Sequence, residues 1–251
     1  MELKFPKLNQ MMKYIVLTFF LAIALTLMGV GVNTFVSILA GFVFIVLIGM
    51  AGVVAIRFEN EKMHKLNEKM TRTKSMDGYV EAMEKIGKRT IWMNIYQQTL
   101  LNRGTAYINL GEYKKSLEVM DELQRYSVNT EVRFLEVWNR LFALIELRNY
   151  GQVQKLMKKY QKLLDAYSKM SESIASRLDI YRYMATGDNV AALELVRACR
   201  EQCTESEQSA IDQLDFYEVR LCQLTGDLER AEELKKQLRS REVFPCIANN
   251  L

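Results

Sequence analysis

The sequence predicts an all-α protein in which a transmembrane helical hairpin precedes a solenoid of about five helix–turn–helix units. Three observations favour this fold class. Residues 14–56 carry no charge, and the rest of the chain repeats a short turn between stretches with helical apolar spacing. Only two prolines occur, and the single Asp-Gly pair, Asp77-Gly78, lies between two helix-period stretches, so signals for β-hairpins are lacking.

We divide the chain into four parts on this basis. They are an N-terminal tail (1–13), the hairpin (14–56), a helical repeat domain (57–240) and a C-terminal tail or cap (241–251).

The uncharged stretch is long enough to cross a membrane twice. It spans 43 residues, and a helix rising about 1.5 Å per residue needs about 20 apolar residues to cross roughly 30 Å of hydrocarbon. The natural break is residues 29–34, which contain two glycines and the only asparagine of the stretch, Asn33. We therefore predict a first membrane helix at Tyr14–Gly31 and a second at Phe35–Ile56.

Positive charge flanks the stretch on both sides. Three lysines, the last of them Lys13, precede it, and six basic residues from Arg57 to Lys74 follow it, whereas the predicted connecting turn is uncharged. The positive-inside rule then places the protein in the cell membrane with both termini in the cytoplasm, with Lys13 and Arg57 at the membrane flanks.

An alternative is that the first helix is a cleaved signal peptide. Its only small-x-small sequence, Ala22-Ile23-Ala24, lies inside the apolar run, whereas a cleavage site would follow the run. The hairpin is the better interpretation.

The charge and motif content of residues 57–251 disfavours several function classes. This part holds 31 basic and 29 acidic side chains, a balance without the basic footprint of a nucleic-acid-binding protein. No catalytic Ser/His/Asp set, P-loop, dinucleotide-binding glycine turn or HExxH motif occurs, so we expect no enzymatic activity and no cofactor. Cys199 and Cys203 lie one helical turn apart, but His64 is distant in sequence, so we expect reduced thiols and no metal site.

The repeats are clearest near the C-terminus. Ala185-Thr186-Gly187-Asp188 is followed by Ala192, and the pattern recurs 39 residues later at residues 224–227, followed by Ala231. Glycine can close one helix and aspartate can cap the next. Related turns give the positions 77, 111, 148, 187 and 226, with spacings of 34, 37, 39 and 39 residues.

One unit carries a family resemblance. Gly104-x-x-Tyr107-x-x-x-Gly111-x-Tyr113-x-x-Ser116 resembles the tetratricopeptide repeat pattern. The likeness extends over about residues 60–240, is partial in the units at 187 and 226, and is poor at 148, where Leu141 replaces the small residue. It implies an α-solenoid in which the first helix of each unit lines a concave surface for a protein or peptide.

The resemblance also implies candidate binding residues on that surface. Some family members grip a peptide carboxylate with Lys and Asn, but Leu101 and Thr105 stand at those positions here, so an apolar, aromatic groove for an amphipathic helix or extended peptide is expected. We interpret Trp138 and Phe142 as binding anchors, with a role in the core between repeats as the alternative. The candidates are Leu101, Thr105, Ile108, Trp138, Phe142, Ile145, Arg177, Tyr181 and Phe216.

Two further segments have two interpretations each. The basic run Lys155, Lys158, Lys159 and Lys162 is typical of a solvated helix face, but it would also suit an acidic partner or a membrane. The apolar tail at residues 243–247 is expected to fold back over the open end of the solenoid; the alternative is a free interaction peptide.

These features predict a membrane-anchored interaction scaffold. Its partners are a cytoplasmic protein or peptide and the lipid bilayer, and self-association through the hairpin is left open. The alternative is an oligomeric membrane-active protein or transporter subunit in which the repeats are regulatory. The absence of ionisable residues from 14–56 disfavours it, because ion and substrate paths usually contain them.

Overall fold

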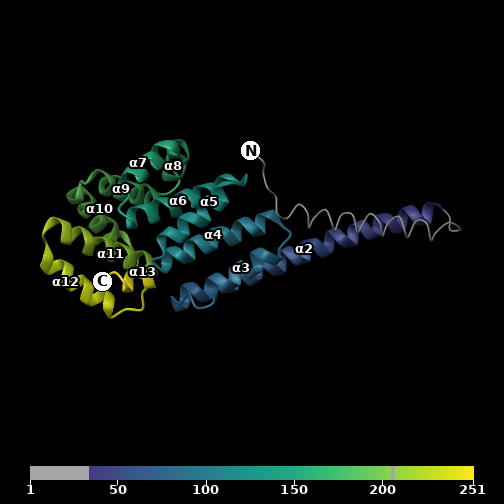
Figure 1. Cartoon of the computed structure of the whole chain (residues 1–251), viewed down its shortest axis with the longest axis horizontal. Helices are drawn as coiled ribbons and strands as arrows, with labels where there is room; N and C mark the ends of the chain where they lie inside the picture. The colour runs from purple at the N-terminus through teal and green to yellow at the C-terminus, as the bar shows by residue number, and fades with distance from the viewer. Residues whose placement is uncertain (1–33, 205–206) are drawn as a thin grey trace.

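The computed structural model describes residues 34–204 and 207–251, and the regular elements of these ranges are helices (Figure 1). The all-α prediction is therefore confirmed for the described part of the chain. The elements are α2 (Thr34–Thr73), α3 (Tyr79–Arg89), α4 (Met93–Asn109), α5 (Tyr113–Gln124), α6 (Thr130–Glu146), α7 (Tyr150–Lys159), α8 (Gln161–Ser168), α9 (Glu172–Thr186), α10 (Asn189–Gln202), α11 (Gln208–Thr225), α12 (Leu228–Arg239) and α13 (Pro245–Ala248).

Consecutive helices pack against each other as hairpins. The pairs α2–α3, α4–α5, α6–α7, α9–α10 and α11–α12 are joined at the five predicted turns. The second helix of one unit also contacts the first helix of the next, as in α3–α4, α5–α6 and α10–α11. The described residues thus form an α-solenoid in which each unit buries its apolar face against its neighbours.

Four of the turns share one backbone conformation. Gly111, Gly187 and Gly226 have φ angles of 79°, 81° and 89°, and Arg148 takes the same place with φ 54°. In each turn the next residue donates its amide to a carbonyl five positions earlier; the pairs are Glu112–Tyr107, Asn149–Leu144, Asp188–Tyr183 and Asp227–Cys222. The predicted aspartate caps are present, because the side chains of Asp188 and Asp227 accept from the amides of Ala191 and Arg230.

The third unit departs from the others in its second helix. That helix is interrupted at Tyr160 (φ −109°, ψ 19°) and continues as α8. The change of direction stacks the Tyr167 ring on Phe134, with centroids 3.9 Å apart and planes 4° apart. The basic run is exposed and divided between the two helices, with Lys162 on α8.

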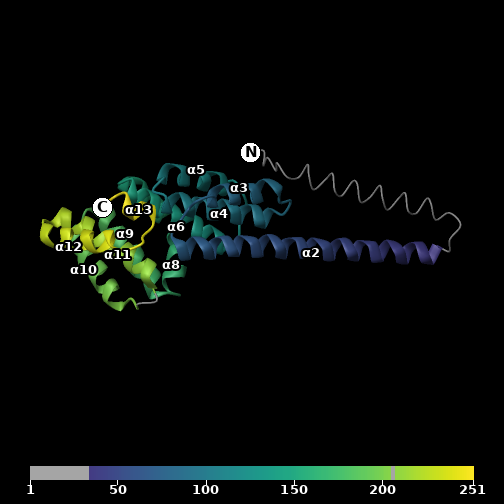
Figure 2. The same cartoon turned by 90° about the horizontal axis from the view of Figure 1, so that it is seen from below.

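Helix α2 extends well beyond the predicted second membrane helix. It is one continuous helix of 40 residues, roughly 60 Å long at about 1.5 Å per residue, and it projects from the stack (Figure 2). The predicted boundary between Ile56 and Arg57 falls inside it, since no helix stop separates the apolar segment from the charged one. The predicted helix at 14–31 and the flank Lys13 lie outside the described residues.

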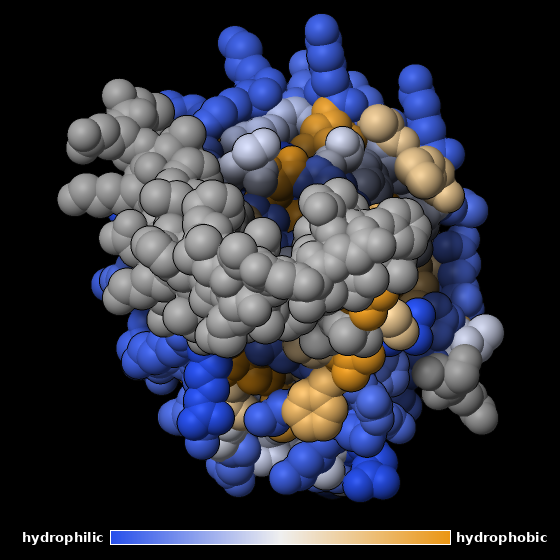
Figure 3. Space-filling model, turned by 90° about the vertical axis from the view of Figure 1, so that its right-hand side faces the viewer, coloured by the Kyte–Doolittle hydropathy of each residue, from blue (hydrophilic) through white to orange (hydrophobic). Residues whose placement is uncertain are grey.

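The outer part of α2 presents apolar side chains to its surroundings. Phe42, Val43, Val46, Met50, Val53, Val54 and Phe58 are exposed. In Figure 3, viewed from the side toward which α2 projects, small groups of hydrophobic side chains are visible inside a rim of hydrophilic ones. Within the described ranges, none of the helices combines the length and the apolarity needed to cross a membrane.

The C-terminal tail returns to the first units of the stack. Helix α13 packs against α4, and Cys246 and Ile247 are buried. Phe244 lies under the Lys74 ammonium, 4.6 Å from ring centroid to Nζ, and Lys74 also donates a hydrogen bond to the Ser209 hydroxyl at the start of α11. The tail folds back, but onto α4 and the end of α2, whereas it was expected to cover the open end of the solenoid. Its path runs across the inside of the stack and brings the first unit, the last unit and the tail together.

Arg148 is a test of the shared turn. A residue with a Cβ is strained at positive φ, so Arg148→Gly should raise the free energy of unfolding by about 0.5–1 kcal/mol, and Gly187→Ala should lower it by about 1 kcal/mol. Urea unfolding of the two full-length variants followed by circular dichroism measures both. Opposite signs are expected, and a stabilising Gly187→Ala would contradict the shared geometry.

Ser116 occupies the small-residue position of the second unit and is fully buried. Its hydroxyl has no hydrogen-bond partner within the described residues, whereas the equivalent Ala192 and Ala231 are apolar and equally buried. A buried hydroxyl without a partner costs about 1–3 kcal/mol of desolvation.

Ser116→Ala should therefore stabilise the protein by about 1 kcal/mol. The matched change Ala192→Ser should destabilise it by a similar amount. Both are measured by urea unfolding, and a loss of stability in Ser116→Ala would show that the hydroxyl is satisfied.

Candidate partner-binding groove

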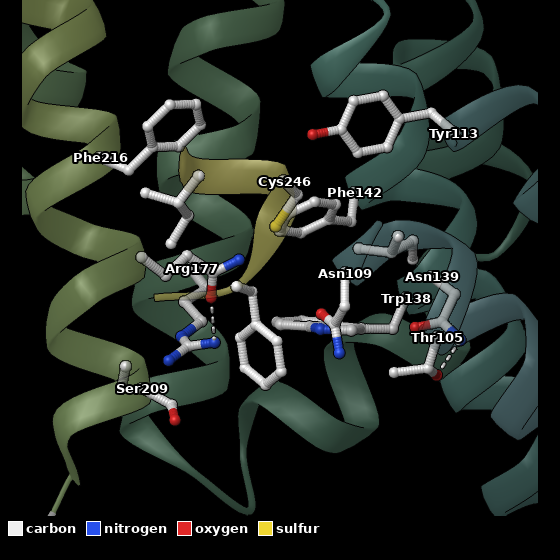
Figure 4. A pocket seen from close by; sticks show the side chains of 15 residues that line it. Thr105, Asn109, Tyr113, Trp138, Asn139, Phe142, Arg177, Ser209, Phe216 and Cys246 are labelled. Carbon is white, nitrogen blue, oxygen red and sulfur yellow. Dashed lines mark hydrogen bonds between the residues drawn. The ribbon is translucent and has the colours of Figure 1, made fainter. Parts of the chain in front are cut away.

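A cavity of about 380 Å³ lies between α4, α6, α9, α11, the first residue of α5 and the tail (Figure 4). Its middle is apolar, and polar side chains stand at its two ends. We call this cavity the groove; its lining residues are Thr105, Ile108, Asn109, Tyr113, Trp138, Asn139, Phe142, Arg177, Ser209, Ala210, Gln213, Phe216, Phe244, Cys246 and Ile247.

The structure brings six of the nine candidate residues together in the groove, namely Thr105, Ile108, Trp138, Phe142, Arg177 and Phe216. The other three do not line it. Leu101, Ile145 and Tyr181 are 5%, 0% and 1% exposed and belong to the hydrophobic core. They lie on the expected helices, but their side chains pack between helices. Each of these helices has neighbours on more than one side, so more than one of its faces is buried.

Several groove residues were not among the candidates. Asn109, Asn139 and Gln213 lie within one turn of candidates on the same helices, and helical periodicity alone would have suggested them. The contributions of Phe244, Cys246 and Ile247 had no such signal, because they depend on the path of the tail.

Seven aromatic rings form a continuous chain from the solvent side of α8 to the groove. Neighbouring ring centroids are 3.9 to 6.4 Å apart, within the range of favourable aromatic pairs. In order, the rings are Tyr167, Phe134, Trp138, Tyr181, Tyr217, Phe142 and Tyr113. Trp138 and Phe142 therefore pack in the core through one face and line the groove through the other, so the wall of the groove is held by the core.

Polar groups mark the two ends of the groove. At one end the Asn139 amide donates to the Thr105 hydroxyl at 2.9 Å. At the other end the Arg177 guanidinium donates to the Gln213 side-chain oxygen at 3.1 Å (Figure 4). Within the described residues Arg177 makes no salt bridge, although its charge helps to lower the pKa of Glu207.

Other arginines of the stack are engaged by buried carboxylates. Glu136, Asp215 and Glu218 are at most 2% exposed, and each binds two arginines from the same or a neighbouring helix. The pairs are Glu136 with Arg133 and Arg140, Asp215 with Arg200 and Arg241, and Glu218 with Arg197 and Arg230. Arg177 differs from these in lining the groove.

A buried ion pair lies beside the groove. Arg220 of α11 donates to both carboxylate oxygens of Glu146 of α6 at 2.8 Å, and the Tyr113 hydroxyl also hydrogen-bonds Glu146. Burial raises the pKa of Glu146 above its usual value, and the Arg220 charge opposes that shift. Burial likewise raises the pKa of Cys246 to about 12, with the Glu146 charge adding to it. Cys246 is therefore a neutral thiol at neutral pH, which does not suit a nucleophile.

Arg220→Met should destabilise the protein by about 3–5 kcal/mol at pH 8, because it leaves a buried carboxylate without its partner. The loss should be smaller at pH 5. A carboxyl whose pKa is raised in the folded state favours folding at low pH, and this contribution is lost as pH rises through that pKa. Urea unfolding at the two pH values measures the difference. In the double variant Glu146→Gln, Arg220→Met the extra pH dependence should disappear; its persistence would contradict the assignment to Glu146.

No protein-family model, curated protein or solved structure matches the chain. The described helices are arranged in a way that is compatible with an α-solenoid, and an aromatic-lined cavity lies between them. The likeness to tetratricopeptide repeats rests on the pattern of residues 104–116 and its weaker copies.

Proposed function

We propose that this protein is a membrane-anchored interaction scaffold whose tetratricopeptide-like repeats recruit a protein or peptide partner in the cytoplasm. The observation that carries the proposal is the groove, which joins side chains from five helices and the tail around one apolar cavity. Such a surface is the kind on which helical repeat proteins bind their partners.

The chemistry of the groove favours a peptide with an apolar centre and polar ends. Its volume of about 380 Å³ falls in the range of ligand-binding pockets, roughly 300–1,000 Å³. Trp138, Phe142 and Phe216 supply aromatic surface, and Arg177 supplies a charge that a partner carboxylate can neutralise. A charged hydrogen bond of this kind contributes about 1.5–3 kcal/mol when it is shielded from water.

The sequence supports membrane attachment through residues 14–56. This stretch lacks charge and has basic residues on both flanks, and the apolar side chains exposed on α2 form a continuous apolar surface, which marks a site for lipid or another helix. We propose a two-helix anchor with both termini in the cytoplasm. The repeat domain then begins on the cytoplasmic half of α2.

Site-specific photocrosslinking in membranes tests the proposal. A benzoylphenylalanine at Asn109 or Ser209, on opposite sides of the groove, should give the same crosslinked partner, and the probe at the exposed Lys158 should not. Arg177→Glu should reduce the yield roughly tenfold, the equivalent of about 1.4 kcal/mol, with Arg182→Glu on the exposed face of α9 as the matched control.

Membrane attachment is measured in the same cells. The full chain should remain in the pellet after alkaline extraction, and a chain without residues 14–56 should be released. Equal crosslinking from Lys158 and the groove positions would argue against a specific site. Release of the full chain into the soluble fraction would overturn the anchor.

A further inference from the structure

The C-terminal tail is seated in the groove in the manner of a bound peptide. Phe244, Cys246 and Ile247 line the cavity, and the latter two are only 6% and 4% exposed. Phe244 and Ile247 are three residues apart in a single helical turn and so project from the same side of it. The tail forms one wall of the groove, and the remaining walls come from α4, α5, α6, α9 and α11.

Beyond Arg241, few polar contacts hold the tail to the rest of the molecule. Its backbone hydrogen bonds are internal, from Ile247 and Ala248 to the Phe244 carbonyl and from Asn249 to the Pro245 carbonyl. The Asn250 side chain also bonds within the tail, to the Cys246 carbonyl. Two arginines join the tail to other elements in the described residues. Arg241, at the start of the tail, donates to Asp212 and Asp215 of α11 at 3.3 and 2.7 Å, and Arg239 donates to the Leu251 carbonyl at 2.7 Å. Beyond Arg241 the tail is therefore held mainly by apolar contact and by the Lys74 ammonium over Phe244.

We propose that the tail is an exchangeable occupant of the groove, and that the partner is a peptide segment of the same chemistry. That segment carries an aromatic residue followed three positions later by an aliphatic one in a helical turn, with an acidic residue placed to meet Arg177. The tail lacks an acid at this place, since Arg177 bonds only Gln213 among the described residues. This proposal rests on the proposed function, because it names what the groove binds and what competes for it.

The added acid decides the direction of exchange. The tail is attached to the chain and thus has an effective concentration in the millimolar range, so a partner must bind more tightly than the tail to displace it. Pairing with Arg177 is an interaction that the partner makes and the tail does not. Weakly binding apolar peptides therefore do not displace the tail, whereas peptides that carry the acidic residue do.

The structure offers a covalent lock for the tail. A Cβ built on Gly111 lies 3.9 Å from the Cys246 Cβ, and disulfides need about 3.5–4.5 Å between these atoms. Gly111→Cys therefore places a thiol where oxidation can bond it to Cys246. Gly111 has φ 79°, so the substitution also strains the turn, and the reduced form of the same variant is the matched control.

The experiment uses the full chain in nanodiscs with Gly111→Cys and with Cys199, Cys203 and Cys222 changed to Ala. The probe is a fluorescent synthetic peptide of residues 242–251 in which Cys246 is Ala and Asn249 is Asp, read by anisotropy. The reduced protein should bind it, and oxidation by oxidised glutathione should weaken binding at least tenfold. The same peptide with Phe244→Ala should bind the reduced protein at least tenfold more weakly.

Two outcomes overturn the proposal. Equal binding to the oxidised and reduced forms would place the peptide outside the site of the tail. The second outcome is that the peptide binds neither the reduced form nor a chain that ends at Arg241 and retains its helical circular dichroism. The tail would then be a permanent part of the fold that does not exchange. Binding to that shortened chain should otherwise be the tightest, because the competing segment is gone.

The photocrosslinking probes at Asn109 and Ser209 separate this proposal from the proposed function. A partner that crosslinks to both the locked and the unlocked protein supports the scaffold and overturns the exchange. If the protein binds the peptide reversibly but crosslinks to no partner in membranes, the exchange of the tail is supported and the scaffold function is overturned.

Discussion

Units three and five of the stack meet directly, and the groove depends on this contact. In a solenoid each unit normally touches only its neighbours, but here Arg220 of α11 reaches Glu146 of α6, 74 positions away in sequence. The Phe142 and Tyr217 rings, 6.3 Å apart, reinforce the contact. The stack therefore curves tightly enough for α4, α6, α9 and α11 to surround one cavity. A more open curvature would leave the same side chains on separate surfaces.

Burial of charge accompanies this curvature. Glu136, Asp215 and Glu218 are removed from solvent at the interfaces between helices, and an isolated carboxylate there would cost several kcal/mol. Two arginines on each offset the cost and fix the register of the helices they come from. Asp215 and Glu218 connect α10 and the end of α12 to α11, so the last two units are joined by directional contacts as well as by apolar packing.

Much of this architecture could be predicted from the sequence, because it depends on local chemistry. The Gly187-Asp188 and Gly226-Asp227 turns combine a left-handed glycine with an aspartate cap within two residues, and both form as predicted. The groove was predicted less completely. Tyr181 and Ile145 were predicted to face the concave surface for the same reason as Phe142. The sequence does not show which of the three side chains faces the cavity, because that depends on how the helices pack.

The features that escaped prediction are those set by distant partners. The break at Tyr160 allows Tyr167 to stack on Phe134, which lies 33 residues earlier in the numbering. The buried carboxylates look like ordinary surface charges in the sequence until their arginines are known. The path of the tail depends on Lys74 and α4, more than a hundred residues away. The continuation of α2 past Ile56 reflects good helix formers on both sides of the boundary, so polarity changes there without any change of conformation.

Because α2 is continuous, it joins its exposed apolar segment directly to the repeat stack. From Thr34 to Thr73 it is a single rod without a hinge, and the next residue, Lys74, rests on Phe244 and Ser209. The inner part of the rod, around Met63, packs in one core with α3 and α4. The same helix therefore carries the exposed apolar segment at one end and, one residue past its other end, a contact to the C-terminal tail.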